Sequence, residues 1–278
     1  KKPPLPLHSF EGVGGRPLTP TAYLVNPGPR GTTVGKPSVS LQYLMLGQKD
    51  MPTFATTWTL GRRLELGYAV NRLGLDDFND DVFDSGLGDV HADRLYLHHF
   101  NARFQVIPEN VCGRGITPAV TVGGHYKYNA NIDGINRDVG DGLEMLDYDD
   151  NYGFEATLTA SKTITALPRP VIISAGLRQS RASQFGLQGF SDDDMLSAEG
   201  NIGVLLTDRL LVGAEYRQQQ EAMESVPGLV EGADSMWDVH AGYVLDMNSV
   251  VYAVVGDAGD VLNHKDETFY GLVYKYEF

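Results

Sequence analysis

The sequence contains only one cysteine, Cys112, in 278 residues. One cysteine cannot form an internal disulfide, and it excludes sites that need paired cysteines, such as C-x-x-C-H haem attachment or cysteine-held iron–sulfur clusters. Cys112 lies in "PENVCGRG", a short turn, and has two interpretations: it forms a disulfide with another protein, or it is an unpaired turn residue. The second is the simpler one.

Positive charge is also scarce, with 22 Lys and Arg against 36 Asp and Glu and a formal net charge of −14. This balance excludes a nucleic-acid partner, which needs a positively charged surface. No apolar run reaches the roughly 18 residues of a transmembrane helix, and the longest, such as "VVYAVV" at 250–255, have the length of strands. The opening "KKPPLPLHSF" has no apolar core of a signal peptide. Because the rest of the sequence indicates export, we expect that a signal peptide was removed before residue 1.

From residue 38 onward the sequence follows a period of two, which is typical of β-strands. In "RRLELGYAV", for example, Leu64, Leu66 and Tyr68 lie on one face and Glu65 lies on the other. Twelve segments follow this period: 38–47, 53–60, 62–73, 94–107, 116–130, 150–164, 170–182, 196–207, 209–220, 236–246, 249–258 and 267–278.

The connections between these segments are alternately short and long. Short ones fall near 61, 108–115 and 208, whereas longer ones fall near 48–52, 74–93 and 131–149. An even number of strands with short turns at one end and long loops at the other is the layout of a bacterial outer-membrane β-barrel. A soluble sandwich or a lipocalin-like barrel is the alternative.

Three features favour the membrane. The apolar face carries aromatic residues near strand ends, as aromatic girdles do. The polar face carries Gly beside charged residues, which suits a crowded lumen better than an open surface. The segments are also longer than the usual strands of soluble sheets and match the length of tilted membrane strands. We therefore predict an all-β protein, a transmembrane antiparallel up-and-down β-barrel of about twelve strands over residues 38–278.

The closing "FYGLVYKYEF" resembles the C-terminal signal of bacterial outer-membrane proteins, in which aromatic residues alternate up to a terminal Phe. The resemblance implies insertion into the outer membrane by the barrel-assembly machinery. It assigns the signal to Tyr274, Tyr276 and Phe278.

Three further stretches, "EGVGGRPLTP", "SRASQFGLQGF" and "LLVGAEYR", resemble segments of an uncharacterised bacterial family of predicted outer-membrane proteins, a domain of unknown function. The sequence departs from that family after "GAEYR", where it continues "QQQEAM". This resemblance supports the fold and implies no activity.

The polar face of the strands should line the lumen. Twelve strands lie between the eight that side chains fill and the sixteen or more that leave a water channel. A narrow channel for small polar solutes is the favoured function. A closed barrel that serves as a structural or partner-binding component is the alternative. The candidate lumen-lining residues carry both signs of charge, which either function permits because buried charges must pair: Arg63, Glu65, His99, Arg103, His125, Lys127, Glu155, Arg178, Glu215, Arg217, Asp238, His240 and Lys275.

The first 37 residues differ from the rest, because they hold eight of the fourteen prolines. Proline lacks a ladder donor, so we predict irregular chain here. Residues 1–37 are either a periplasmic tail or a plug that folds into the lumen.

Two acidic loops raise the question of calcium, since carboxylates at high density bind Ca²⁺. The spacing of an EF-hand is absent, and a solvated acidic rim that shares divalent ions with lipopolysaccharide is the alternative. The weak calcium candidates are Asp76, Asp77, Asp80, Asp81 and Asp84.

A hydrolase is a less favoured class. It would use His98 with Ser85 or Asp89, but no G-x-S-x-G motif is present. We therefore expect neither catalysis nor a cofactor. The expected partners are outer-membrane lipid, lipopolysaccharide and the assembly machinery, and a further protein partner stays open.

Overall fold

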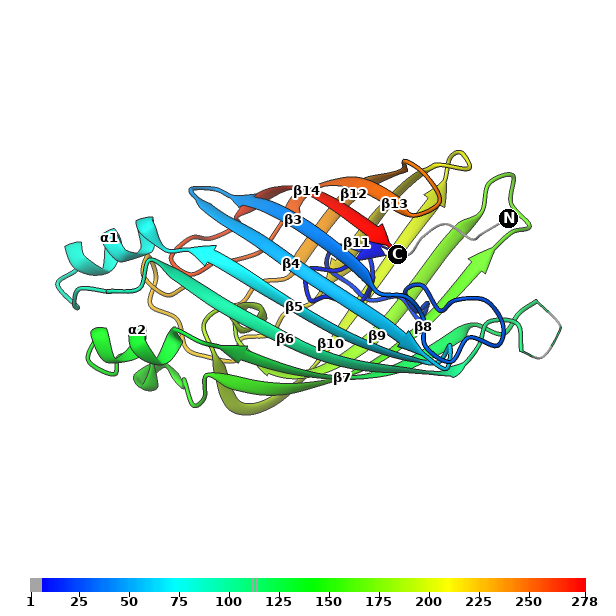
Figure 1. Cartoon of the computed structure of the whole chain (residues 1–278). Helices are drawn as coiled ribbons and strands as arrows, with labels where there is room; N and C mark the ends of the chain where they lie inside the picture. The colour runs from blue at the N-terminus through cyan, green and yellow to red at the C-terminus, as the bar shows by residue number, and fades with distance from the viewer. Residues whose placement is uncertain (1–6, 112, 114) are drawn as a thin grey trace.

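The computed structural model describes residues 7–111, 113 and 115–278, so Cys112 and the start of the N-terminal segment lie outside the described residues. Twelve antiparallel strands form a closed barrel in which each strand pairs with its sequence neighbours and β14 pairs with β3 (Figure 1). This confirms the predicted fold. The strands are β3 (Ser38–Leu46), β4 (Lys49–Leu60), β5 (Leu64–Gly74), β6 (Arg94–Ile107), β7 (Ala119–Asn129), β8 (Tyr152–Ile164), β9 (Val171–Ala182), β10 (Phe190–Leu205), β11 (Leu210–Arg217), β12 (Met236–Val244), β13 (Ser249–Asp257) and β14 (Thr268–Glu277).

The period of two puts apolar side chains on the outside of the barrel. Leu41, Trp58 and Leu272 are 64%, 45% and 59% exposed. Four neighbouring strands, β5 to β8, carry an aromatic stripe of Tyr68, Phe100, Tyr126 and Phe154, whose successive ring centroids are 5.2, 6.1 and 5.1 Å apart. An apolar, aromatic outer face around a closed barrel is what a lipid environment requires.

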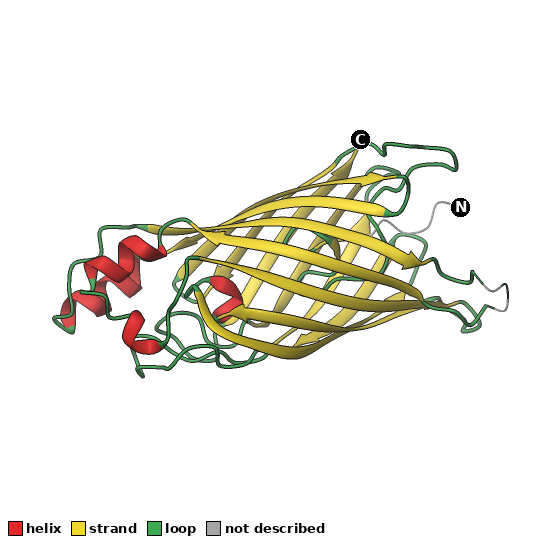
Figure 2. Cartoon of the chain, turned by 90° about the horizontal axis from the view of Figure 1, so that it is seen from below, coloured by secondary structure: helices red, strands yellow, loops and turns green. Residues whose placement is uncertain are grey.

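The two ends of the barrel differ. The C-terminus and most of the short turns lie at one end, here called the turn end, and the helices and long connections lie at the other, the loop end (Figure 2). One predicted long loop is wrong: β4 begins at Lys49, directly after the turn at Gly47 and Gln48. Pro52 fits in this strand because the pairing of β4 with β5 starts only at Thr53, so one side of the strand still lacks a ladder there.

The connections at the loop end fold together into an apolar lid, defined here as residues 75–93, 130–151, 183–189, 218–235 and 258–267. It contains α1 (Asp76–Asp84), α2 (Ile132–Asp138) and two short 3₁₀ turns, η1 (Glu144–Leu146) and η2 (Gln184–Gly186). Buried lid residues such as Phe78, Ile135 and Leu262 pack with Leu73 and Leu97 of the wall. Among the described residues, none of the helices is both long and apolar enough to cross a membrane.

The described part of the N-terminal segment, from residue 7, enters the ring of strands (Figure 1). Residues 7–22 are all buried. They include a two-stranded ribbon of β1 (Leu7–His8) and β2 (Gly14–Gly15). Residues 7–25 are called the plug below. The chain then leaves the lumen at the turn end, where Pro29 and Arg30 are exposed.

Candidate functional site

Polar side chains of the barrel wall converge on the lumen around the plug. Every predicted lumen-lining residue except Arg63 is buried and inward-facing. The alternation of each strand explains this placement: Glu155 of β8 and Arg178 of β9, for example, lie on the buried face while their sequence neighbours are more exposed.

Arg63 is a correction. It is exposed in the turn before β5, and its guanidinium donates to the backbone oxygens of Gln105 and Val106. β5 starts at Leu64, one residue after Arg63. Gly61 and Arg62 both have a left-handed φ, at 52° and 60°, and so belong to the turn before the strand. The alternation of β5 therefore does not extend back to Arg63.

The wall satisfies the hydrogen bonds of the irregular plug backbone. Arg103 donates to the carbonyl oxygens of Gly14 and Thr21, at 2.7 and 2.9 Å. Asn101 donates to that of Glu11 at 2.7 Å. Glu65 accepts from the backbone N–H groups of Gly14 and Val25. A chain without regular structure is tolerated at membrane depth only where protein or water satisfies its polar groups, and here wall side chains do so.

The largest group of charges forms around Glu11 of the plug. This central cluster consists of three acids and three bases, so its formal charges balance: Glu11, Glu155, Glu199, Lys127, Arg178 and Arg217. Glu11 is within 2.8 Å of Lys127, 2.9 Å of Arg178 and 3.1 Å of Arg217. Buried charges require such pairing, and the single acid of the plug completes it.

The lid reaches the same cluster through Phe185 of η2. The Phe185 ring centroid lies 4.4 Å from Lys127 Nζ and 4.6 Å from Arg217 Cζ, and Lys127 also donates to the Phe185 carbonyl oxygen at 3.0 Å. These are cation–π contacts, which strengthen when water is excluded. Plug, wall and lid therefore meet at one place.

Other predicted lumen residues form smaller pairs. Glu65 lies 3.3 Å from Arg103 Nε, and Lys275 lies 2.7 Å from Glu277. His99 pairs with Asn71, and His125 pairs with Asn101. These contacts join wall residues to one another, and Glu65, Arg103 and Asn101 also bind the plug, so they link the plug to a stiffened wall.

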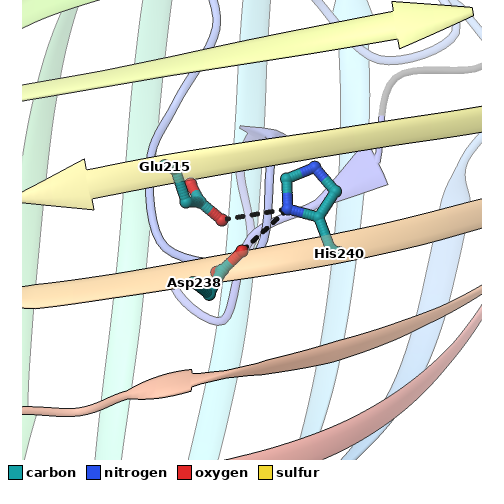
Figure 3. A group of neighbouring side chains, drawn as sticks. All are labelled: Glu215, Asp238 and His240. Atoms are coloured by element: carbon teal, nitrogen blue, oxygen red, sulfur yellow. Dashed lines mark hydrogen bonds and ion pairs between the residues drawn. The ribbon is translucent and has the colours of Figure 1, made fainter.

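A separate buried group lies across β11 and β12 (Figure 3). Glu215 is directly opposite Asp238 in the strand pairing, and His240 lies two residues further along the same face. His240 Nδ1 is 2.8 Å from Asp238 Oδ1 and 3.8 Å from Glu215 Oε1. Glu215 also accepts from the backbone N–H groups of Leu18 and Thr19 in the plug, at 2.9 and 2.7 Å.

The calcium prediction for the first acidic loop is not supported. Most of that loop folds into α1, where described carboxylates have separate partners. Asp77 pairs with Lys49 and His264, and Asp81 accepts from Asn263. Among the described side chains of α1, no three acids come together as metal ligands. Burial alone would raise the pKa of Asp77, but Lys49 and His264 outweigh it and hold this pKa below its usual value.

The residues considered for a hydrolase are engaged separately. His98 lies on the outer side of β6, where its Nδ1 is 2.9 Å from the Tyr68 hydroxyl. Ser85 donates to the Val82 carbonyl oxygen at the end of α1. The structure therefore gives His98 and Ser85 different partners on different elements.

Two functional features were missed by sequence reasoning. Glu11 and Glu199 belong to the central cluster, but neither was among the candidates. Glu199 continues the inward alternation of β10, so its pattern was a usable signal. Glu11 has no such pattern, because the irregular plug has no period. The second feature is the apolar layer at the loop end, where a small cavity is lined mainly by Phe10, Leu18, Leu44, Met51, Phe185 and Phe269.

Solved structures with a similar fold include a porin and an outer-membrane channel. The KdgM porin, alone and in complex with disordered oligogalacturonate, superposes with a TM-score of 0.52 and 11% identity over 87% of this chain and 99% of that chain. The COG4313 outer membrane channel from Pseudomonas putida F1 gives 0.51 and 12% identity over 90% of this chain and 99% of that chain. At this identity the likeness concerns the fold alone.

Comparison with curated proteins found no match. A family model described as "Protein of unknown function (DUF3034)" matches residues 6–272. The match covers the plug and nearly the whole barrel. The chain therefore belongs to the DUF3034 family, whose fold is a plugged twelve-stranded outer-membrane β-barrel in this member.

Proposed function

We propose that the protein is a porin-like outer-membrane channel for small polar solutes whose pathway is closed by the plug. The observation that carries the proposal is the chemistry of the wall behind the plug. Around residues 7–25 the wall is lined by hydrogen-bonding and charged side chains, such as Asn101, Arg103 and Thr121. If the plug withdrew, these groups would face water, as the lining of a polar pathway does.

The orientation follows from the layout. A barrel with an even number of strands has both termini on one side, which is the periplasmic side for outer-membrane barrels. The turn end then faces the periplasm, the lid faces outward, and the plug enters the lumen from the periplasm. The apolar outer belt contacts lipid, and the lid borders lipopolysaccharide.

The way in which the plug is held favours a removable element. The plug is held by the ion pairs of Glu11 as well as by the apolar packing of Phe10 and Leu18. A buried ion pair gains little over apolar packing, because desolvation of the charges offsets their attraction. If the plug leaves, water enters the lumen and solvates the charges of the wall, which lowers the cost of breaking these ion pairs.

The relatives of known structure are consistent with this function. The KdgM porin has been solved in complex with disordered oligogalacturonate. We transfer only the class of solute, small and polar, because the sequences share 11% identity.

Liposome flux tests the proposal. The full chain, a variant lacking residues 1–25, and a control lacking only residues 1–6 are reconstituted at equal protein-to-lipid ratios. Entry of neutral and charged polar solutes of increasing size is then measured. We expect slow flux with the full chain and the control, and fast, size-limited flux with the deletion of residues 1–25.

The alternative function is a closed barrel that acts as a structural or partner-binding component. The apolar lid favours it, because lid residues such as Phe78 and Ile135 belong to the same buried apolar cluster as Phe10 of the plug. If the variant without residues 1–25 folds but passes no solute, the channel proposal fails and the closed barrel stands.

A further inference from the structure

The group of Glu215, Asp238 and His240 differs from the other buried acids of the lumen in its charge balance. Glu11, Glu65, Glu155, Glu199 and Glu277 each have a Lys or Arg nitrogen within 3.3 Å. For Glu215 and Asp238, His240 is the only basic side chain within 4.0 Å among the described residues. Arg16 of the plug lies nearby but forms no ion pair with either carboxylate at that distance among the described residues.

Two opposed, buried carboxylates whose one basic side chain within 4.0 Å, among the described residues, is a histidine require compensation. Asp238 is completely buried and His240 is 4% exposed. Asp238 Oδ2 and His240 Nε2 have no hydrogen-bond partner among the described residues. Buried carboxylates this close together either share a proton or hold a cation.

The geometry of the three donors suits a cation. One oxygen from each carboxylate and His240 Nδ1 lie within 4.8 Å of one another. In a tetrahedral zinc site, ligands about 2.1 Å from the metal are about 3.4 Å apart. The two observed distances from His240 Nδ1, 2.8 and 3.8 Å, bracket that separation. Figure 3 shows both carboxylates directed at the same ring nitrogen.

The local structure holds the donors in place. Cross-strand pairing puts Glu215 opposite Asp238, and Gly213 is opposite His240. A Cβ atom on Gly213 would lie 2.5 Å from His240 Nε2, so only glycine leaves room for the imidazole ring. Glu215 is oriented further by Thr19, whose hydroxyl donates to Oε2 at 2.6 Å.

We propose that Glu215, Asp238 and His240 form a binding site for a divalent transition-metal ion of the zinc type. One imidazole and two carboxylates are a donor set that zinc accepts, with a fourth position left for water. Ca²⁺ and Mg²⁺ prefer sites made only of oxygen. This site is independent of solute passage, so its test does not rely on conductance.

The test measures zinc retained by the untagged full chain. The protein is refolded in detergent with Zn²⁺, because the plug covers the site once the barrel has formed. Loosely held metal is then removed with a weak chelator, and zinc is counted by mass spectrometry. The site variants are His240→Gln and Asp238→Asn, and the control is His125→Gln, which changes another buried lumen histidine. Folding is checked by the mobility of heated and unheated samples on gels.

We expect wild type and His125→Gln to retain one zinc per chain and both site variants to lose affinity at least about tenfold, the lower range for damage to a metal site. Co²⁺ in place of Zn²⁺ should give a four-coordinate visible spectrum in wild type. Wild type without zinc, or zinc that persists in Asp238→Asn, would overturn the site and leave a shared proton as the compensation. If a variant does not fold, the Co²⁺ spectrum of wild type decides, and its absence counts against the site.

Discussion

Glu11 of the plug and Arg178 of β9 form a two-point contact across 167 residues of sequence. Arg178 Nη2 donates to Glu11 Oε2 at 2.9 Å, and Nη1 is 3.3 Å from Oε1. Paired contacts of this kind fix orientation as well as distance. Arg178 also binds Glu155 and Glu199 of the wall, so the plug is attached to a residue that the wall itself holds.

Glu11→Gln should loosen the plug. The variant leaves three bases against two acids in the central cluster, and the excess positive charge is relieved when water enters the lumen. We expect chymotrypsin to cleave after Phe10 or Tyr23 in the variant but not in wild type. Mass spectrometry of the barrel fragment gives the cleavage point. Asp149→Asn, which changes an exposed ion pair with Arg181, should stay resistant. Equal resistance of Glu11→Gln and wild type would show that Glu11 does not hold the plug.

Arg178→Leu should destabilise the folded barrel. It leaves Glu11, Glu155 and Glu199 without their shared base, and removal of one member of a buried charge group costs about 3–5 kcal/mol. The free energy of unfolding in denaturant measures the loss. Arg181→Leu is the matched control, since Arg181 lies three residues further along β9 in a more exposed pair. A loss below about 1 kcal/mol, the range of surface pairs, would contradict the role of Arg178.

Acid should weaken the anchorage of α1 through Asp77. Because the pKa of this acid is held below its unfolded value of 3.8, its stabilising effect is complete above about pH 4 and is lost as the pH falls through the lower folded-state pKa. The thermal stability of wild type should therefore exceed that of Asp77→Asn at neutral pH, and the difference should vanish in acid. Asp84→Asn, at an exposed position of the same helix, should match wild type throughout. A pH-independent difference for Asp77→Asn would rule out this linkage.

The outward aromatics of the closing strand should promote assembly. Tyr276 and Phe278 contact each other edge to face, with ring centroids 5.0 Å apart. On the resemblance of "FYGLVYKYEF" to an assembly signal, Phe278→Ala should lower the amount of folded barrel in bacterial outer membranes. Leu272→Ala removes an exposed apolar side chain from the same face and should have a smaller effect. Folded barrel is measured by its gel mobility without heating, and equal yields from the two variants would count against the signal.

The strands were predictable because alternation is a local property that each strand carries by itself. The inward placement of residues such as Glu155, Arg178 and His240 follows from the same pattern. The error at Arg63 arose because a left-handed turn interrupts the alternation, and nothing in "GRR" marks where the turn ends.

The contacts between strands and plug were not predictable. Alternation puts Asp238 and His240 on one face, but only the register of β11 against β12 brings Glu215 opposite Asp238. Glu11 meets Arg178 because the plug follows an irregular path, held by side chains from many strands. Such a path depends on the assembled lumen and has no counterpart in local sequence.

The central claim is that the plug closes a pathway through the barrel. Single-channel recording in planar bilayers tests it most directly, with the full chain and the variant without residues 1–25 compared at the same voltages. We predict that the full chain is closed or opens only briefly, and that the variant conducts steadily with a narrow-pore conductance. A folded variant that stays as silent as the full chain would contradict the account.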